Sequence, residues 1–198
     1  MSTTQSLRQM LAQGEFVIAP GVYDMFSARI ADALDFKALY MTGYGVSGSH
    51  AGLPDAGLVT YTEMVGRAAA IAEGITRPLI ADADTGFGGA FNIARTVREM
   101  ERAGVAAIHL EDQEQAKRCG HRPNKATVAV EEMCDRLRAA VDARRDEIVE
   151  KHLEPRIGRQ AAQRRRAAVA RDDVGAVALP NARRDDFVAA LGPDHVGG

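Results

Sequence analysis

The chain has 198 residues, 46% of them hydrophobic, and a formal net charge of −2, which is typical of a soluble domain with one sizeable core and does not indicate a nucleic-acid binder. No apolar run reaches the roughly 20 residues that a membrane helix needs, and the first residues, MSTTQSLRQM, lack the basic-then-apolar order of a signal peptide. We therefore expect a cytoplasmic protein with no membrane partner and no nucleic-acid partner.

Strand-like and helix-like runs alternate along residues 16–143. The strand-like runs are FVIAP (16–20), KALYMTGYG (37–45), RPLIADADTG (77–86) and VAAIHLEDQ (105–113). Each precedes a run with apolar residues at helical spacing: MFSARIADAL (25–34), TEMVGRAAAIAEG (62–74), FNIARTVREMERAG (91–104) and VEEMCDRLRAAVDA (130–143). In the first helix these are Phe26, Ile30, Ala33 and Leu34, and in the third Ile93, Val97, Met100 and Ala103. Four β-then-α units predict parallel strands with helices packed outside them.

Polar residues follow each predicted strand directly: Asp24, the segment 42–44, Asp82 with Asp84, and Glu111 with Asp112. In barrels built from βα units, catalytic side chains gather at the carboxyl ends of the strands, where the loops meet at one mouth. We therefore expect Asp82, Asp84 and Glu111 to lie on neighbouring strands and to face one cavity.

The stretch DADTGFGG (82–89) has two other interpretations besides a functional one. Its aspartates could form a polar strand end, or an Asx-type turn in which aspartate oxygens accept from nearby backbone amides. Three carboxylates in one mouth, however, repel one another and take up protons unless a cation lies among them. Mg²⁺ suits such a site, because it prefers oxygen ligands and keeps several waters. The pattern therefore favours a magnesium site.

The loop KRCGHRPNK (117–125) supplies a second reactive group, Cys119. Positive neighbours lower the pKa of a thiol, which suits this cysteine to moving a proton near neutral pH. The alternative is a buried, inert cysteine, which the polarity of the run disfavours. Cys134 lies among apolar residues of the last helical run, where we expect a small core residue. The different contexts of the two cysteines argue against a disulfide, and no second Cys/His pair follows at zinc spacing.

Four of these runs resemble one enzyme superfamily. LYMTGYGVSGSHAGLPDAG, DADTGFGGAFNIARTVREM, HLEDQ and AKRCGHRPNKA resemble the isocitrate lyase and phosphoenolpyruvate mutase superfamily, and the last is most similar to the 2-methylisocitrate lyases. The resemblance covers about residues 7–145. It implies an α/β fold of the (β/α)8 TIM-barrel family, with only about four βα units recognisable here. It also implies a Mg²⁺ ion and the cleavage or formation of a bond next to a pyruvate- or glyoxylate-like enolate.

The resemblance assigns roles to individual residues. Asp82, Asp84 and Glu111 match the acidic residues that hold Mg²⁺ directly or through water. Cys119 matches the general acid of the lyases on a mobile gating loop, and Asp55 of LPDAG matches an active-site aspartate. The residues expected to bind the substrate are Tyr40, Thr42, Gly43, Tyr44, Gly120 and His121.

Two comparisons within the superfamily bear on the substrate, a 2-hydroxy or 2-oxo acid. The phosphonomutase branch lacks the cysteine loop, so the KRCGH run favours a C–C lyase that yields an α-keto acid and a carboxylic acid. The similar 2-methylisocitrate lyases have a Ser-Gly-Gly run where this chain has Thr42, Gly43 and Tyr44. The ring of Tyr44 narrows the expected pocket, so a smaller or differently shaped malate or oxaloacetate derivative is a plausible substrate beside 2-methylisocitrate.

A larger departure begins near residue 146. Residues 146–198 form an atypical Arg/Ala-rich tail with a triplet at Arg164–Arg166 and one strand-like run, VGAVALP (174–180). We find no match there to the second half of the barrel. A frameshifted coding sequence is one hypothesis, and poor order of the tail is another expectation. The expected organisation is a barrel part, residues 1–145, which carries the metal and catalytic loops, followed by this tail.

Three kinds of function stay open at this point. The first is a Mg²⁺-dependent C–C lyase acting on 2-methylisocitrate or a substituted malate. The second is an oxaloacetate decarboxylase or a phosphonomutase-like member of the superfamily. The third is a non-catalytic fragment that keeps the metal ligands. Members of the superfamily form homo-oligomers that exchange a carboxyl-terminal helix, and no segment of this chain matches that helix, so the same assembly is not expected.

Overall fold

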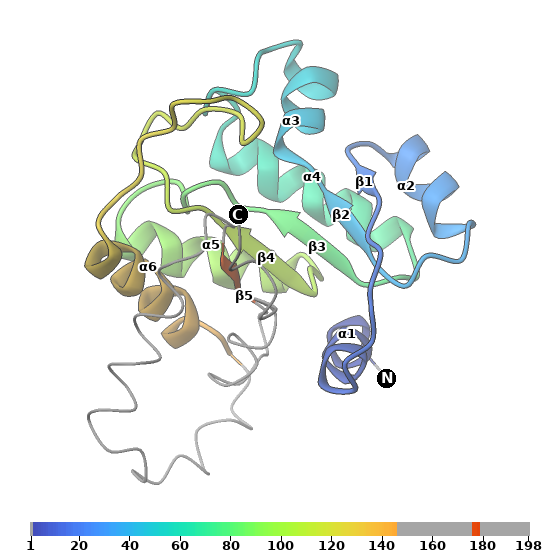
Figure 1. Ribbon diagram of the computed structural model, residues 1–198. Coiled ribbons are helices and arrows are strands. Elements are labelled where there is room, and N and C mark those ends of the chain that lie inside the picture. The colour runs from blue at the N-terminus through green and yellow to red at the C-terminus, as the bar shows by residue number, and fades with distance from the viewer. Residues whose placement is uncertain (1, 146–175, 179–198) are drawn as a thin grey trace, which may run out of the picture.

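The computed structural model describes residues 2–145 and the backbone of residues 176–178 (Figure 1). The strands are β1 (Gly21–Val22), β2 (Leu39–Met41), β3 (Leu79–Asp82), β4 (Ala107–Leu110) and β5 (Ala176–Ala178). The helices are α1 (Thr3–Ala12), α2 (Met25–Asp32), α3 (Gly43–Val46), α4 (Tyr61–Gly74), α5 (Ala90–Arg102) and α6 (Val130–Asp142), with a π-helix, η1 (Ser47–Ala51), directly after α3. The α/β class predicted from the sequence is confirmed.

The strands form one sheet whose order, β1-β2-β3-β4-β5, follows the order of the chain. β1 to β4 are parallel, as the four βα units predict, and the register places Met41 beside Ala81 and Asp82 beside His109. β5 lies within the strand-like run at 174–180 and pairs antiparallel with β4.

The position predicted for the first strand, residues 16–20, is wrong, because β1 begins at Gly21. Pro20 accepts a hydrogen bond from the N–H of Tyr40 at 3.0 Å but has no N–H of its own to continue the ladder. Phe16 and Ile18 are exposed. The end of the second predicted strand is also wrong, since residues 43–45 belong to α3.

The amino-terminal helix α1 was not anticipated from the sequence. Ser2 caps it: the Ser2 hydroxyl accepts from the N–H of Gln5 at 3.2 Å, and the side chain of Gln5 accepts from the N–H of Ser2 at 3.0 Å. This S-x-x-Q pattern is a capping box, which is a readable signal in the sequence. Leu7 of α1 packs against Ala38 and Ala106, which precede β2 and β4, so α1 covers the amino-terminal end of the sheet.

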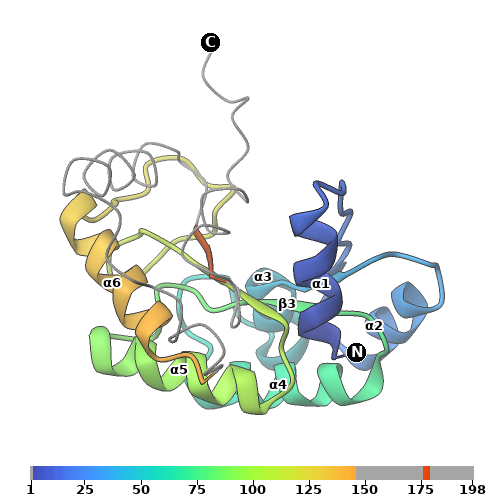
Figure 2. The ribbon, with the colours of Figure 1, turned by 90° about the horizontal axis from the view of Figure 1, so that it is seen from below.

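Helices α4 and α5 lie side by side on one face of the sheet (Figure 2). The predicted apolar face of α5 is confirmed, since Ile93, Val97 and Met100 are buried and Ala103 is partly buried. Gly104, with a φ of 82°, adopts the left-handed conformation that commonly ends a helix. The core between these helices and the sheet includes Leu39, Met41, Leu79 and Ile108 from the strands and Met64, Ile71, Ile93 and Met100 from the helices.

The apolar spacing in α2 predicts the helix correctly but indicates the wrong buried face. Phe26, Ile30 and Leu34 are 83%, 63% and 62% exposed, whereas Ala28 and Ala31 are the buried residues. Small side chains allow this helix to lie close to the sheet and to α4, so the large apolar side chains point outward.

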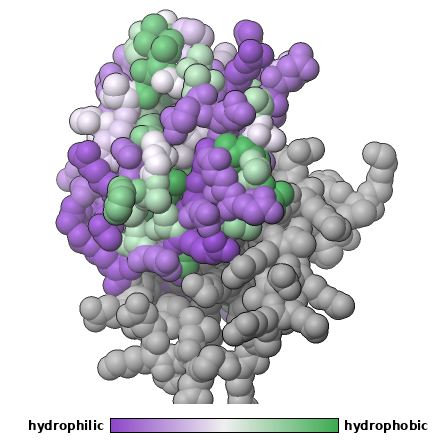
Figure 3. Space-filling view, turned by 90° about the vertical axis from the view of Figure 1, so that its left-hand side faces the viewer, coloured by the Kyte–Doolittle hydropathy of each residue, from purple (hydrophilic) through white to green (hydrophobic). Residues whose placement is uncertain are grey.

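The surface on the side of α6 differs in polarity from the exposed apolar face of α2. This side of the molecule is largely hydrophilic, with small hydrophobic patches between the polar residues (Figure 3).

Among residues 2–145 and 176–178, no helix has the length and apolar character needed to cross a membrane. The predictions made for residues 146–175 and 179–198, including the boundary of the tail, lie outside the described residues.

Candidate active site

The carboxyl ends of β2, β3 and β4 bring polar residues into one row. The register pairs Met41 with Ala81 and Asp82 with His109, and Thr42 follows Met41 directly at the end of β2. Pairing continues one step beyond the strands, because the N–H of Glu111 donates to the carbonyl of Asp84 at 2.8 Å. The strand ends therefore position the three predicted acidic residues on neighbouring segments, as the βα pattern predicts.

The carboxylate of Asp82 accepts two backbone hydrogen bonds. Oδ1 accepts from the N–H of Asp84 at 2.9 Å, and Oδ2 accepts from the N–H of Gly43 at 3.1 Å. The first contact is the Asx-type turn that the sequence left open. The second requires glycine, because a Cβ at position 43 would lie 2.6 Å from Oδ2. Each oxygen keeps a further lone pair, so the turn is compatible with a ligand role.

Lys117 is buried between two of the predicted carboxylates. Its Nζ lies 2.6 Å from Oδ1 of Asp55 and 2.6 Å from Oδ1 of Asp84. The expectation that the KRCGH run is too polar for burial is therefore wrong for its first residue, since two carboxylates accompany the charge into the interior. Asp84 has a φ of 47°, a left-handed conformation in which Asp and Asn are enriched among non-glycine residues. The ion pairs join the cysteine loop, the loop after η1 and the end of β3.

Two buried polar side chains, Gln113 and Arg136, fix the loop after β4. Nε2 of Gln113 donates to Oε2 of Glu111 at 2.8 Å and to the carbonyl of Arg118 at 2.9 Å, and its Oε1 accepts from the N–H of Arg118 at 2.9 Å. Nη1 of Arg136 donates to the carbonyl of Gln113 at 2.8 Å. These bonds attach the cysteine loop to the end of β4 and orient the carboxylate of Glu111.

Two of the predicted ligands, Asp84 and Glu111, have raised pKa values. Burial and the charge of Asp82 raise the pKa of Asp84 to about 6, although Lys117 opposes the shift. Burial and again Asp82 raise the pKa of Glu111 to about 7. Burial by itself disfavours the charged form of Lys117, but the carboxylates outweigh it and hold its pKa above the usual value. The site therefore holds more negative charge than one ammonium neutralises.

The residues fit a magnesium ion by the chemistry of their donors. All three predicted ligands are carboxylates, and the raised pKa values of Asp84 and Glu111 reflect a negative charge that a cation would relieve. Within residues 2–145, however, no three His, Cys, Asp or Glu side chains are arranged to hold a metal in this conformation. Asp84 is paired with Lys117, and Glu111 is bonded to Gln113. The set Asp82, Asp84 and Glu111 remains a prediction.

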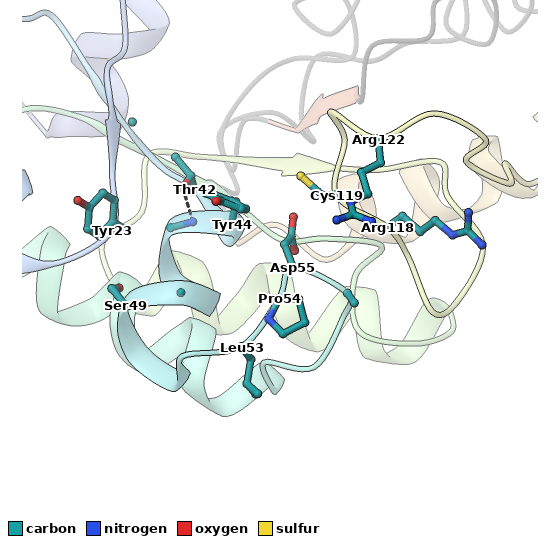
Figure 4. A pocket seen from close by; sticks show the side chains of 14 residues that line it. Tyr23, Thr42, Tyr44, Ser49, Leu53, Pro54, Asp55, Arg118, Cys119 and Arg122 are labelled. Atoms are coloured by element: carbon teal, nitrogen blue, oxygen red, sulfur yellow. Dashed lines mark hydrogen bonds between the residues drawn. The ribbon is translucent and has the colours of Figure 1, made fainter.

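A cavity of about 1070 Å³ lies between α3, η1 and the cysteine loop (Figure 4). Four of the predicted site residues line it: Thr42, Tyr44, Asp55 and Cys119. Figure 4 shows the thiol of Cys119 directed from its loop toward the side where Tyr44 and Asp55 lie. Tyr44 is 67% exposed, which places its ring at the mouth of the cavity rather than deep within it.

Asp55 connects this cavity with the carboxylates beneath it. Asp82, Asp84 and Glu111 are not among the residues that line the cavity. Asp55 lines it, and through Lys117 the same side chain is joined to Asp84. Asp55 is therefore the residue through which the cavity that Cys119 lines is connected to the predicted metal ligand Asp84.

The predicted substrate-binding residues Tyr40, Gly120 and His121 do not line the cavity. The hydroxyl of Tyr40 lies 3.1 Å from Nδ1 of His109, and burial together with the nearby acids raises the pKa of Tyr40, so the phenol stays neutral. Nδ1 of His121 lies 3.8 Å from Sγ of Cys119. The carbonyl of Gly120 accepts from Nζ of Lys125 at 2.6 Å. Gly120 and His121 lie beside Cys119 but outside the cavity lining.

Four residues of the site were not predicted as functional: His109, Gln113, Lys117 and Arg136. Three of them belong to two motifs in which other residues were predicted to be functional: HLEDQ, which contains Glu111, and KRCGH, which contains Cys119. Their buried contacts depend on the register of β3 with β4 and on the path of the cysteine loop. Arg136 carries no signal in the sequence, since an arginine on a charged helix is ordinarily solvated.

The two cysteines differ less than the sequence suggests. Cys119 and Cys134 are both partly exposed and free of disulfides. The expectation that Cys134 is a buried core residue is wrong, because its neighbours Met133 and Leu137 take the buried positions of α6. Cys134 lies at the border of that face.

Known proteins share this arrangement of strand ends and loops. The family model for phosphoenolpyruvate phosphomutase matches residues 7–191. The chain belongs to the phosphoenolpyruvate mutase and isocitrate lyase superfamily. The resemblance carried by the DADTGFGG, HLEDQ and KRCGH motifs is thereby confirmed, and the superfamily match includes part of the tail.

Two curated relatives of the superfamily are lyases. The 2,3-dimethylmalate lyase of Eubacterium barkeri is 54% identical over 144 residues, which are 73% of this chain and 50% of that protein. The 2-methylisocitrate lyase of Shewanella oneidensis is 50% identical over 139 residues, which are 70% of this chain and 48% of that protein. The chain thus spans about half the length of the curated relatives it matches.

Solved structures of the superfamily agree with the fold. Oxaloacetate acetylhydrolase in complex with the inhibitor 3,3-difluorooxalacetate has a TM-score of 0.70 and 46% identity, covering 72% of this chain and 49% of that chain. Phosphonopyruvate hydrolase in complex with oxalate and Mg²⁺ has a TM-score of 0.67 and 32% identity, covering 74% of this chain and 50% of that chain. The α/β fold with its parallel strands β1 to β4 is therefore that of the superfamily, of whose solved members this chain covers about half.

Proposed function

We propose that the protein is a Mg²⁺-dependent carbon–carbon lyase that cleaves a 2-hydroxy acid to an α-keto acid and a carboxylic acid. The observation that carries the proposal is the double contact of Asp55. This side chain lines the cavity beside Cys119 and, through Lys117, is joined to the carboxylates at the strand ends. A cation site joined to the cavity through Asp55 and a proton donor that lines the same cavity are the parts that such a cleavage needs.

The substrate that we propose is a substituted malate. The 2,3-dimethylmalate lyase and the 2-methylisocitrate lyase both act on branched 2-hydroxy acids, as their names state, and the former is 54% identical to this chain. Tyr44 stands at the mouth of the cavity, where its ring limits the size of the substituent that can enter. A compact methyl-substituted malate suits this opening better than the longer tricarboxylic acids.

Asp82, Asp84 and Glu111 would hold the magnesium ion. When bound, the ion would act as a Lewis acid toward the hydroxyl and carboxylate oxygens of the substrate. The Mg²⁺ ion in phosphonopyruvate hydrolase supports this part of the proposal. The chain's own residues fix the ligands: Gly43 and Asp84 hold Asp82 by backbone N–H groups, and Gln113 orients Glu111.

Cys119 would deliver the proton. Breaking the bond between the hydroxyl-bearing carbon and its neighbour leaves a ketone on one fragment and an electron pair on the other. That electron pair, next to a carboxylate, takes the proton of the thiol, while the hydroxyl proton passes to a carboxylate of the site as the ketone forms. Exchange with water after product release would return a proton to the thiolate and remove the one from the carboxylate. A loop is a suitable place for the acid, because its closure brings the thiol to the substrate and excludes water.

Release of an α-keto acid tests the proposal. The 198-residue protein is incubated with 2,3-dimethylmalate, 2-methylisocitrate, isocitrate and oxaloacetate, with and without Mg²⁺, and keto acid formation is followed with a coupled dehydrogenase. We expect turnover of the substituted malate only when Mg²⁺ is present. Oxaloacetate stands in the panel because oxaloacetate acetylhydrolase is 46% identical to this chain, and cleavage of oxaloacetate alone would reassign the reaction to hydrolysis or decarboxylation.

Cys119→Ser is the matched variant for this assay. Proton transfer by a placed side chain contributes about 10² to 10⁴ in rate, so the variant should lose activity by that order while keeping its fold and its Mg²⁺ affinity. Cys134→Ser, a change of the same kind on α6, should retain activity. Turnover that survives in Cys119→Ser would show that the reaction draws its proton elsewhere, and no turnover in any arm would identify a non-catalytic member of the superfamily. A cytoplasmic location and a small-molecule partner belong to the same proposal.

A further inference from the structure

Lys117 occupies a buried junction whose position determines that of Cys119. The exposed fractions of the Lys117, Asp55 and Asp84 side chains are 4%, 6% and 10%. Burying an ammonium is costly unless carboxylates accompany it, so these contacts strongly favour one placement of the lysine. Only Arg118 separates Lys117 from Cys119, and both the N–H and the carbonyl of Arg118 are bonded to Gln113. The backbone from Lys117 to Cys119 therefore has little freedom while the ion pairs persist.

The same junction overlaps the proposed cation site. Asp84 belongs to the predicted ligand set, and its Oδ1 is the atom that pairs with Lys117. A divalent cation bound at Asp84 would repel the ammonium and compete with it for the carboxylate. Asp55, in contrast, is bonded to Lys117 from the loop side and lines the cavity.

We propose that Lys117 is a positioning residue that holds the Cys119 loop against Asp55 and Asp84, and that a divalent cation bound at Asp84 loosens this hold. Cation occupancy and the position of the thiol are then coupled through one lysine. The inference rests on the proposed function for the roles of Asp84 and Cys119. Its test is alkylation of the thiol, which needs no turnover, so its failure can be told apart from the failure of the lyase reaction.

The rate of alkylation of Cys119 by iodoacetamide reports on the position of the loop. The chain has two cysteines, so a Cys134→Ser background leaves Cys119 as the single thiol. In this background we expect Mg²⁺ to accelerate alkylation several-fold. Lys117→Met should accelerate it without Mg²⁺ and remove most of the response to Mg²⁺. Lys117→Arg, which keeps the charge and can bond both carboxylates, should restore slow alkylation and the Mg²⁺ response.

The direction of the change separates a positioning role from a purely electrostatic one. A positive charge near a thiol favours the reactive thiolate, so loss of charge alone slows alkylation. Arg122 lies three residues beyond Cys119 on the exposed part of the same loop, and its N–H donates to the carbonyl of Cys119 at 2.9 Å. Arg122→Gln keeps that backbone bond and should slow alkylation while leaving the Mg²⁺ response intact. Slowing of the same kind in Lys117→Met would overturn the proposal.

Two further measurements decide the remaining outcomes. Circular dichroism establishes whether Lys117→Met folds, and if it does not, Asp55→Asn breaks one of the two ion pairs and should accelerate alkylation to a smaller extent. An unchanged rate in Asp55→Asn would then refute the positioning role. Calorimetry measures Mg²⁺ binding directly. Binding without any change in the alkylation rate would overturn the coupling, whereas absence of binding would overturn both the coupling and the metal part of the proposed function.

Discussion

At Gly43 the backbone of α3 contacts a proposed metal ligand, Asp82. A Cβ at this position would lie 2.6 Å from Oδ2 of Asp82 and 3.2 Å from its Cγ. We expect Gly43→Ala to displace that carboxylate, to lower the free energy of unfolding by about 1–3 kcal/mol as other overpacked sites do, and to weaken Mg²⁺ binding. Urea unfolding and calorimetry measure the two effects. Gly48→Ala is the control, because a Cβ at position 48 meets no atom within 4 Å.

Of the three proposed ligands, Asp82 is the one that we expect to contribute most to Mg²⁺ affinity. Its two oxygens are oriented by the N–H groups of Gly43 and Asp84, and its charge raises the pKa of both other predicted ligands. Asp82→Ala should therefore lower Mg²⁺ affinity more than the same change at Asp84 or Glu111, as measured by calorimetry. Asp135→Ala on the exposed face of α6 serves as the control. Equal affinity in Asp82→Ala and the unaltered protein would leave Asp82 with the turn as its role.

The capping box of α2 predicts how much the aspartate at its amino-terminal end contributes to stability. Oδ1 of Asp24 accepts from the N–H of Ser27 at 2.8 Å, and this bond is the main reason that the pKa of Asp24 lies below its usual value. Replacing an aspartate cap by alanine costs about 0.5–2 kcal/mol, so Asp24→Ala should lower the free energy of unfolding by that amount at neutral pH.

The same cap predicts a dependence on pH. Because the pKa of Asp24 is lower in the folded protein, its ionised form stabilises the fold above the unfolded pKa of about 4, and this contribution is lost as the pH falls through the folded value. Asp24→Asn keeps an acceptor for Ser27 but cannot titrate. Urea unfolding between neutral pH and pH 3 should therefore show a smaller loss for Asp24→Asn than for the unaltered protein, and parallel losses would exclude this contribution.

The elements differ in how far the sequence specifies them. The spacing of Ile93, Val97 and Met100 predicts both the helix α5 and its buried face, because that helix packs on the sheet through large side chains. In α2 the spacing predicts the helix alone, since the contact with its neighbours is made by Ala28 and Ala31. The π-helix η1 has no signal in SGSHA that distinguishes it from a loop. Local patterns indicate an element, whereas its orientation depends on the size of the contacting side chains.

In the candidate site too, the sequence predicts some residues and not others. The acidic strand ends and the reactive cysteine follow from residue type and motif. The burial of Lys117 does not, because its two partners come from segments more than 30 residues away in the chain, and no pattern within the KRCGH run contains them. Arg136 likewise owes its role to a backbone carbonyl of the loop after β4. Long-range ion pairs in a buried site lie beyond what spacing can predict.

For the molecule as a whole, the outward face of α2 predicts self-association. Phe26 and Ile30 lie four residues apart on α2, and Leu34 follows just after its end. All three are mostly exposed, and exposed apolar patches favour association. We expect the 198-residue protein to bind a hydrophobic dye and to elute larger than a monomer in size-exclusion chromatography with light scattering. Phe26→Ser with Ile30→Ser should reduce both signals. Phe91→Ser is the control, since Phe91 is also exposed but lies on α5; an equal effect there would refute a specific role for α2.

The order of the strands also bears on the order in which contacts can form while the chain is synthesised. Each parallel strand pairs with the one synthesised just before it, so every βα unit can dock on a strand that has already been made. The carboxylates of Asp55 and Asp84 are made before Lys117, which arrives only after β4. During synthesis the two ion pairs of Lys117 therefore cannot form until the chain has passed β4, and the contact of Arg136 with Gln113 must wait for α6.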